Sequence, residues 1–263
     1  MKTIDETSEI KDETSKKIIN DEASNGHKKS KIKALRLTWK SFLSVLIVAF
    51  IFSISVIFAY FFFNQEKPLP IYQPAQIHPD LVDESLQQQQ KSHRIAPFTL
   101  QNQYGETVTE AIVAEKVYVA EFFFATCPDI CLLMNAQMQR IAQFFKDENR
   151  FRILSFSVYP EKDTPENLLI YSQNYQAKLP QWTFLTGDKP QIYNLARRSY
   201  FLMKKEAVGF DKAEENGSAS DFIHTNNFVL IDTKNRIRGY YDGTSAQEVD
   251  QLIKDIQKLL KEN

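Results

Sequence analysis

The fold is decided by the stretch VYVAEFFFATCPDIC, residues 117–131. Residues 117–124 are β-branched and aromatic, and Glu121 is their only charge, which is typical of a largely buried strand. Pro128 follows, and proline is favoured at the first position of a helix. The stretch therefore predicts a strand that turns into a helix, with Cys127 and Cys131, the two cysteines of the chain, at the junction.

Strand and helix patterns alternate on both sides of this stretch, which predicts an α/β domain over residues 94–263. Its closing helix begins at the capping box Ser245-Ala-Gln-Glu248. A central sheet flanked by helices, ending in a hairpin and a helix, suits the thioredoxin-like plan. The other predicted elements are a hairpin over 98–108, strands over 153–158 and 182–185, a helix starting at Thr164-Pro165, a helix near 192–198, and a hairpin joining 227–231 to 237–241.

Residues 41–63 carry no charge and are apolar on every face of a helix. About 20 such residues cross the hydrocarbon core of a bilayer. The alternative, a buried core helix, is disfavoured because the segment is apolar on every face without interruption. We therefore expect a transmembrane anchor over 41–63, preceded by a disordered tail over 1–40 and followed by a linker over 64–93.

The flanks of this segment predict its orientation. Residues 27–40 contain six basic residues and no acidic one, so the N-terminus is expected in the cytoplasm and the domain on the periplasmic or outer face. Seven acidic residues among the first 22 argue against a mitochondrial transit peptide. The expected location is a bacterial inner (cytoplasmic) membrane. With a formal net charge of −1, we expect no nucleic-acid partner; the oligomeric state is left open.

The spacing of Cys127 and Cys131 places both thiols on one face of a helix, with their Cα atoms about 6 Å apart. A helix start also favours a thiolate. The pair can therefore bind a soft metal or form a disulfide. Two alternatives remain: the cysteines pack as small apolar residues, on one stripe with Met134 and Met138, or they form a structural disulfide. Both methionines are interpreted as core residues.

His224 is the candidate third ligand because it lies just before the buried strand at 227–231. The loop that enters this strand in a thioredoxin-like fold faces the cysteine junction. Two thiolates and one imidazole suit copper, although zinc accepts the same ligands. His27, His78 and His93 are interpreted as solvated residues of the tail and linker.

Four segments together resemble the SCO/SenC family from about residue 94 onward. They are FFFATCPDIC, FSVYPEKDTPENL, WTFLTGD and IHTNNFVLIDTKNRIRGYYDGTS. The resemblance implies a thioredoxin-like fold and one copper ion held by Cys127, Cys131 and His224. It also implies a partner, the dinuclear copper site of cytochrome c oxidase subunit II. Two positions depart from the family pattern: Leu132 replaces a proline, and Tyr159 replaces an acid.

Three functions remain open. The first is a copper metallochaperone that delivers copper to subunit II or prepares its copper site. The second is a thiol–disulfide oxidoreductase that reduces partner cysteines with Cys127 and Cys131. The third is a tethered assembly scaffold without metal. Enzyme activity is therefore uncertain, and the spacing of three residues between the cysteines, rather than two, favours the chaperone.

Overall fold

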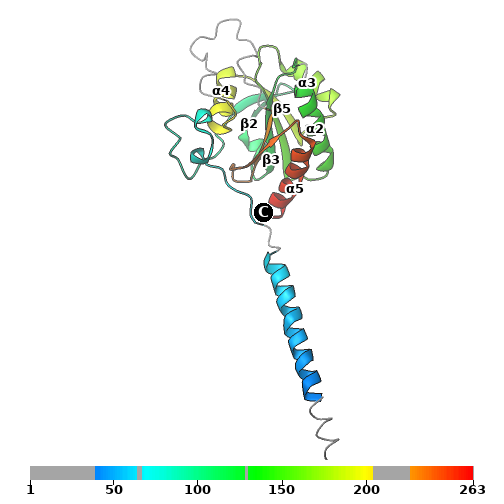
Figure 1. The fold of residues 1–263 in the computed structure, drawn as a ribbon. Helices are drawn as coiled ribbons and strands as arrows, with labels where there is room; N and C mark the ends of the chain where they lie inside the picture. The colour runs from blue at the N-terminus through cyan, green and yellow to red at the C-terminus, as the bar shows by residue number, and fades with distance from the viewer. Residues whose placement is uncertain (1–38, 64–66, 128–129, 204–225, 263) are drawn as a thin grey trace, which may run out of the picture. The chain divides into compact units, whose positions relative to one another are not determined.

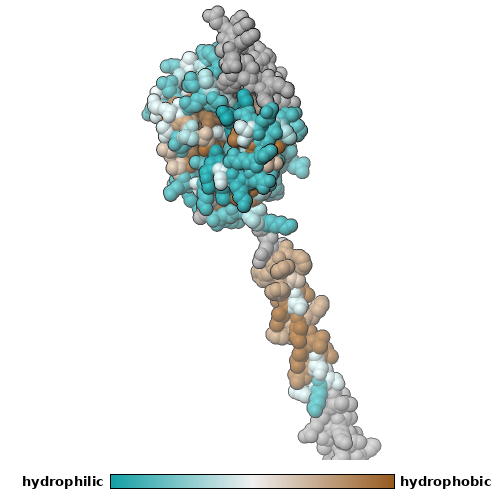
Figure 2. Space-filling model, turned by 90° about the vertical axis from the view of Figure 1, so that its left-hand side faces the viewer, coloured by the Kyte–Doolittle hydropathy of each residue, from teal (hydrophilic) through white to brown (hydrophobic). Residues whose placement is uncertain are grey.

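The structure is a computed structural model that describes residues 39–63, 67–127, 130–203 and 226–262. The chain divides into two units, residues 1–67 and 68–263, and each is described by itself. Among its described residues, the first unit has the helix Trp39–Phe63, with a mean hydropathy of 2.8 and no burial of its most apolar window. Figure 2 shows it as a largely hydrophobic surface. It is long and apolar enough to cross a membrane, and it includes the predicted span over 41–63.

The second unit is built on a seven-stranded sheet in the order β2-β1-β5-β4-β3-β6-β7 (Figure 1). The three central strands β5, β4 and β3 are parallel, and an antiparallel hairpin extends the sheet on each side. This mixed sheet confirms the predicted α/β, thioredoxin-like class. The strands are β1 (Thr99–Asn102), β2 (Thr107–Thr109), β3 (Val117–Phe123), β4 (Phe151–Ser157), β5 (Trp182–Thr186), β6 (Asn227–Ile231) and β7 (Ile237–Asp242).

Helices cover both faces of the sheet. In β3, successive side chains point to opposite faces. Val119 and Phe123 join the core under α2, α3 and α5, whereas Ala120 and Phe122 join the core under α4 and η4. Figure 1 shows α2, α3 and α5 together on one side and α4 on the other. The helices are η3 (Glu110–Val113), α2 (Ile130–Phe144), α3 (Pro165–Asn174), α4 (Lys189–Asn194), the π-helical turn η4 (Leu195–Ser199) and α5 (Ala246–Glu262).

The segment of residues 68–97, here called the arm, packs on the domain, whereas the sequence suggested a linker as far as residue 93. The compact unit begins at Pro68, and two short 3-10 turns, η1 (Pro74–Gln76) and η2 (Pro79–Leu81), lie within the arm. Val82 and Ile95 are buried in the core under α4. The arm has no regular period, so its apolar residues could not be recognised as core from their spacing.

Side-chain caps fix where two helices begin. The Thr164 hydroxyl accepts a hydrogen bond from the backbone N–H of Asn167 (3.4 Å), and α3 starts at Pro165 as predicted. Ser245 accepts likewise from the N–H of Glu248 (3.4 Å). The Glu248 carboxylate, however, accepts from the N–H of Asp242 (2.6 Å). Only half of the predicted capping box therefore forms, because Glu248 reaches back to the end of β7.

Candidate metal centre

Cys127 and Cys131 lie at the carboxyl end of β3, where the strand turns into α2. The backbone N–H of Cys127 donates to the carbonyl of Phe124 (3.2 Å), which closes a tight turn after the strand. Cys131 is in the first turn of α2, which begins at Ile130. The strand-to-helix junction predicted from the sequence is therefore present, with one cysteine on each side of the turn.

The two thiols are free, buried and close to each other. Cys127 is 6% exposed and Cys131 is 4% exposed. Burial raises the pKa of the Cys131 thiol, and a direct interaction with the Cys127 side chain raises that pKa further. Cys131 therefore holds its proton near neutral pH in the metal-free protein. A soft metal ion that replaced the thiol protons would be bound by thiolates, and their burial would shield the metal–sulfur bonds from water.

A buried carboxyl lies on the same face of β3 as the cysteine-bearing helix. Glu121 is fully buried; its Oε1 accepts from the Ser155 hydroxyl (2.6 Å), whose oxygen accepts from Trp182 Nε1 (2.8 Å). Its Oε2 has no hydrogen-bond partner among the described residues. Burial raises the pKa of Glu121 to about 7, and its negative charge adds to the rise in the Cys131 pKa. In the sequence, Glu121 stood out only as the single charged residue of an otherwise apolar predicted strand.

Asn135 holds the first turn of α2 against α3. Its Nδ2 donates to the carbonyl of Cys131 (2.9 Å) and to the Tyr171 hydroxyl (3.0 Å). Its Oδ1 has no partner among the described residues. Sequence reasoning missed Asn135 and Tyr171, because their roles depend on how two helices distant in sequence pack together.

Asp163 ties the loop that precedes Cys127 to the loop that follows β4. Its carboxylate accepts from the N–H of Ala125 (3.0 Å) and from the Ser157 hydroxyl. Burial raises the pKa of Asp163. At the departure from the family pattern, Tyr159 is half-buried, and the Lys162 ammonium lies 5.1 Å from its ring centre. Tyr159 stands where the family pattern has an acid, and Asp163, four residues after Tyr159, supplies a buried carboxyl in the same loop.

The predicted third ligand, His224, lies outside the described residues. Within the described ranges, no three His, Cys, Asp or Glu side chains gather as a metal site. The two sulfurs therefore form an incomplete ligand set there. His78 is exposed, as expected for a solvated residue, but His93 is buried at 8% exposure. The His93 Nε2 lies 2.8 Å from the carbonyl of Ser199, so its role is to fix the arm.

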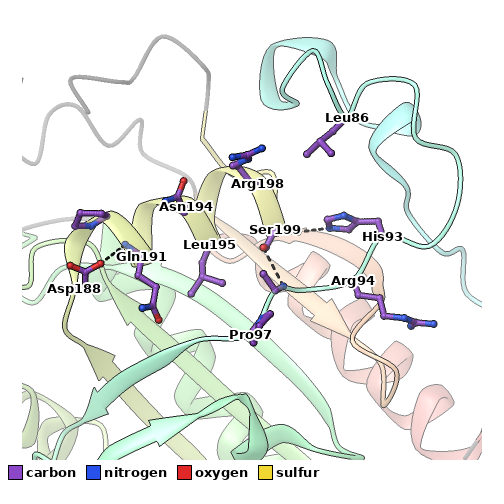
Figure 3. Close-up of a pocket in the computed structure, with 12 residues that line it drawn as sticks. Leu86, His93, Arg94, Pro97, Asp188, Gln191, Asn194, Leu195, Arg198 and Ser199 are labelled. Atoms are coloured by element: carbon purple, nitrogen blue, oxygen red, sulfur yellow. Dashed lines mark hydrogen bonds between the residues drawn. The ribbon is translucent and has the colours of Figure 1, made fainter. Parts of the chain in front are cut away.

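A cavity of about 560 Å³ lies between the arm and the α4–η4 segment (Figure 3). It contains the His93–Ser199 contact, and Arg198 on its wall pairs with Asp83 of the arm (3.0 Å). Leu195, which also lines it, belongs to the core on the face of the sheet opposite the cysteines. No thiol lines this cavity, so the candidate metal centre is the cysteine junction.

Comparisons with known proteins agree with this fold. The "SCO1 protein homolog" of Bacillus subtilis is 32% identical over 168 residues, which cover 63% of this chain and 82% of that protein. The solved structure of BsSco, a member of the Sco family of cytochrome c oxidase assembly proteins, is 31% identical. It covers 64% of this chain and 93% of its own, with a TM-score of 0.53. A relative from Stutzerimonas stutzeri, named for copper binding, is 24% identical over 152 residues, 57% of this chain and 70% of its own.

A sequence model of one family covers most of the domain. It is the model described as SCO1/SenC, and it matches residues 86–261. The match begins inside the arm and includes both cysteines and every strand of the sheet. The chain therefore belongs to the SCO1/SenC family.

Proposed function

We propose that this chain is a membrane-anchored copper metallochaperone that delivers copper to the dinuclear copper site of cytochrome c oxidase subunit II, or prepares that site. Cys127, Cys131 and His224 would hold one copper ion. The observation that carries the proposal is the pair of buried, adjacent thiols at the start of α2. Membership of the SCO1/SenC family and the copper-binding name of one relative support it.

The chemistry of the donors supports copper as the cargo. Thiolates are soft ligands that suit Cu(I), and imidazole suits Cu(II). Two sulfurs alone leave coordination positions open, which His224 would fill in part. An open position allows a ligand of the acceptor protein to bind before the donor ligands leave. Transfer by such ligand exchange keeps copper bound throughout.

The apolar helix Trp39–Phe63 supports the proposed anchoring. With basic residues before it, the tail over 1–40 would be cytoplasmic and the domain would lie on the periplasmic or outer face of a bacterial inner membrane. That face is where the proposed chaperone would meet subunit II. The arm would then belong to the copper-binding domain, while residues 64–67 would connect it to the anchor.

The role of His224 is tested with the full chain in detergent micelles. We expect His224→Ala to weaken Cu(II) binding at least about tenfold and to change the thiolate-to-copper absorption, because one of three ligands is lost. His78→Ala is the matched control, since His78 is exposed, and it should leave both unchanged. Equal spectra and equal affinities in the wild type and His224→Ala would show that His224 is not a ligand.

A thiol–disulfide oxidoreductase is the second candidate, favoured by the two free thiols at interaction distance. In that reaction Cys127 and Cys131 would be oxidised to a disulfide while a partner disulfide is reduced to two thiols. Rapid copper-independent turnover of a partner disulfide, unchanged by His224→Ala, would support this candidate. The raised pKa of Cys131 argues against it as the attacking thiolate near neutral pH.

A further inference from the structure

The two leucines that directly follow Cys131 in the chain are exposed. Leu132 is 51% exposed and Leu133 is 59% exposed, and they follow Cys131 in α2. Within the described part of the domain, they are the only two consecutive large apolar residues that are both exposed. Single exposed apolar residues are normal on protein surfaces, but a contiguous apolar area marks an interaction site.

Other apolar residues next to the two cysteines in the chain are also partly exposed. Phe124, Ala125 and Ile130 are only partly buried and pack against the core that contains both cysteines. Residues 130–139, which include most of α2, carry no charge. At about 100° per residue, Ile130 and Leu132 flank Cys131 on either side of the helix, and Leu133 faces outward. We call these residues the cysteine rim: Phe124, Ala125, Ile130, Leu132 and Leu133.

The burial of the sulfurs makes contact with this rim unavoidable during transfer. Cys127 and Cys131 are 6% and 4% exposed, and a metal–sulfur bond is only about 2.3 Å long. A ligand from another protein can come that close to a metal on these sulfurs only if the surrounding surfaces touch. Apolar surfaces that touch are then removed from water, which stabilises the encounter complex.

We infer that the cysteine rim is the docking surface for the protein that exchanges copper with this site, and that this partner presents its own soft metal ligands within an apolar surface. The inference rests on the proposed chaperone function and names its contact residues. Leu132, which stands where the family pattern has a proline, would contact the partner in this complex. An exposed leucine there adds apolar contact area immediately beside a metal ligand.

The test compares copper transfer from two variants of the full chain in detergent micelles. The docking variant is Leu132→Ser with Leu133→Ser. The control is Phe144→Ser, which removes a side chain of 56% exposure from the same helix, about 17 Å beyond Leu133. Each protein is loaded with Cu(I) and mixed with the metal-free, soluble copper-binding domain of cytochrome c oxidase subunit II from the same bacterium. We expect the second-order transfer rate to fall about tenfold or more in the docking variant and less than about twofold in the control.

The outcomes separate the docking inference from the proposed function. A wild-type chain that binds copper but transfers none would contradict the chaperone function itself. Normal transfer by the docking variant would overturn the docking surface and leave the chaperone function intact. If the double variant binds copper poorly, the single variant Leu132→Ser decides the matter, because Leu132 flanks Cys131 and Leu133 stays in place. Unchanged transfer by a copper-loaded Leu132→Ser chain would also overturn the inference.

Discussion

The domain has two contrasting polar regions, one at each end of β3. The first is a group of paired charges, here called the Arg238 clamp, formed by Asp232, Arg236, Arg238 and Glu262. Ile237 pairs with Ile231, and Ile231 pairs with Tyr118, so the clamp is level with the start of β3. The cysteine junction follows the end of β3, about 20 Å away along the strand.

In the Arg238 clamp, buried charge is fully matched by opposite charge and hydrogen bonds. Arg238 is 4% exposed and contacts Asp232, which is 2% exposed, at 3.1 Å. Arg238 also donates to the carbonyls of Leu69 (2.8 Å) and Pro70 (3.0 Å), which fastens the arm. Burial alone would raise the pKa of Asp232, but hydrogen bonds from Arg236 and Lys234 hold that pKa below its ordinary value.

Around the cysteine junction, buried polar atoms are left without partners. Glu121 has no cation beside it in the described structure, and its Oε2 accepts no hydrogen bond there. Asn135 Oδ1 likewise has no partner in the described ranges. Native proteins rarely leave such groups unmatched, and those that remain concentrate at functional sites. The contrast teaches that the Arg238 clamp pairs its buried charges, whereas a polar, imperfectly satisfied environment lies beside the two thiols.

The largest expected effect is the loss of Cu(I) binding when both cysteines at the junction are replaced. We expect Cys127→Ser with Cys131→Ser to lower Cu(I) affinity by at least about a thousandfold, because hydroxyls are poor ligands for a soft ion. The free energy of unfolding of the metal-free, reduced protein should fall by at least about 2 kcal/mol, because two serine hydroxyls replace buried thiols of the core. Competition with a Cu(I) chelator and urea unfolding measure the two quantities. Retained stoichiometric binding would contradict the metal centre.

The second prediction targets the Arg238 clamp. Arg238→Met should destabilise the domain by about 4 kcal/mol, because it leaves Asp232 buried with one guanidinium fewer and releases two carbonyls of the arm. Copper affinity should not change, since the cysteines lie at the other end of β3. Urea unfolding measures the loss. Arg236→Met is the matched control: its side chain is 26% exposed, so a smaller loss is expected, and equal losses would contradict the special role of Arg238.

The third prediction concerns the unpaired carboxyl near Cys131. Burial raises the pKa of Glu121 from its ordinary value of 4.5 to about 7 in the folded protein. Between these values the folded state binds a proton that the unfolded state does not, so stability falls as pH rises from 4.5 through 7. Glu121→Gln removes this loss. At pH 8 the variant should be more stable than the wild type by about 3 kcal/mol, and at pH 4 the two should be nearly equal.

Urea unfolding at pH 4, 6 and 8 measures this effect. Glu148→Gln is the control of opposite sign, because hydrogen bonds from Arg150 lower the pKa of Glu148. The contribution of Glu148 is therefore present at high pH and lost on acidification, so its variant should be slightly less stable than the wild type at pH 8. If Glu121→Gln instead destabilises the protein at pH 8, the ionised Glu121 carboxylate must be stabilised by a cation outside the described residues.

The smallest expected effect lies in a helix cap at the cysteine end of the sheet. Thr164→Ala should reduce the free energy of unfolding by about 1 kcal/mol, because the N–H of Asn167 loses its acceptor at the start of α3. Thermal unfolding measures the change. Thr164→Ser keeps the hydroxyl and should recover most of the stability; a Ser variant as unstable as the Ala variant would show that the methyl group, not the cap, matters.

The sequence was sufficient for features that depend on local pattern. The apolar residues at 117–124 predicted β3, Thr164-Pro165 predicted the start of α3, and the uncharged residues at 41–63 predicted the long apolar helix. The cysteine spacing also predicted two thiols at a strand-to-helix junction. Each of these signals lies within about one turn or strand of the chain, where periodicity, capping and composition act directly. His224 as the third ligand stays a prediction.

Tertiary structure alone decided the contacts between distant segments. Register along β3, β4 and β5 brings Ser155 to Glu121 and Trp182 to Ser155, and packing of α2 on α3 brings Tyr171 to Asn135. The sequence suggested a linker for the arm because its irregular spacing gives no core pattern; only the tertiary structure buries Val82 and Ile95 and brings Arg238 to the carbonyls of Leu69 and Pro70. Local sequence thus determined the elements and the two sulfurs, while burial and register determined their surroundings, because those depend on which remote residues share the same space.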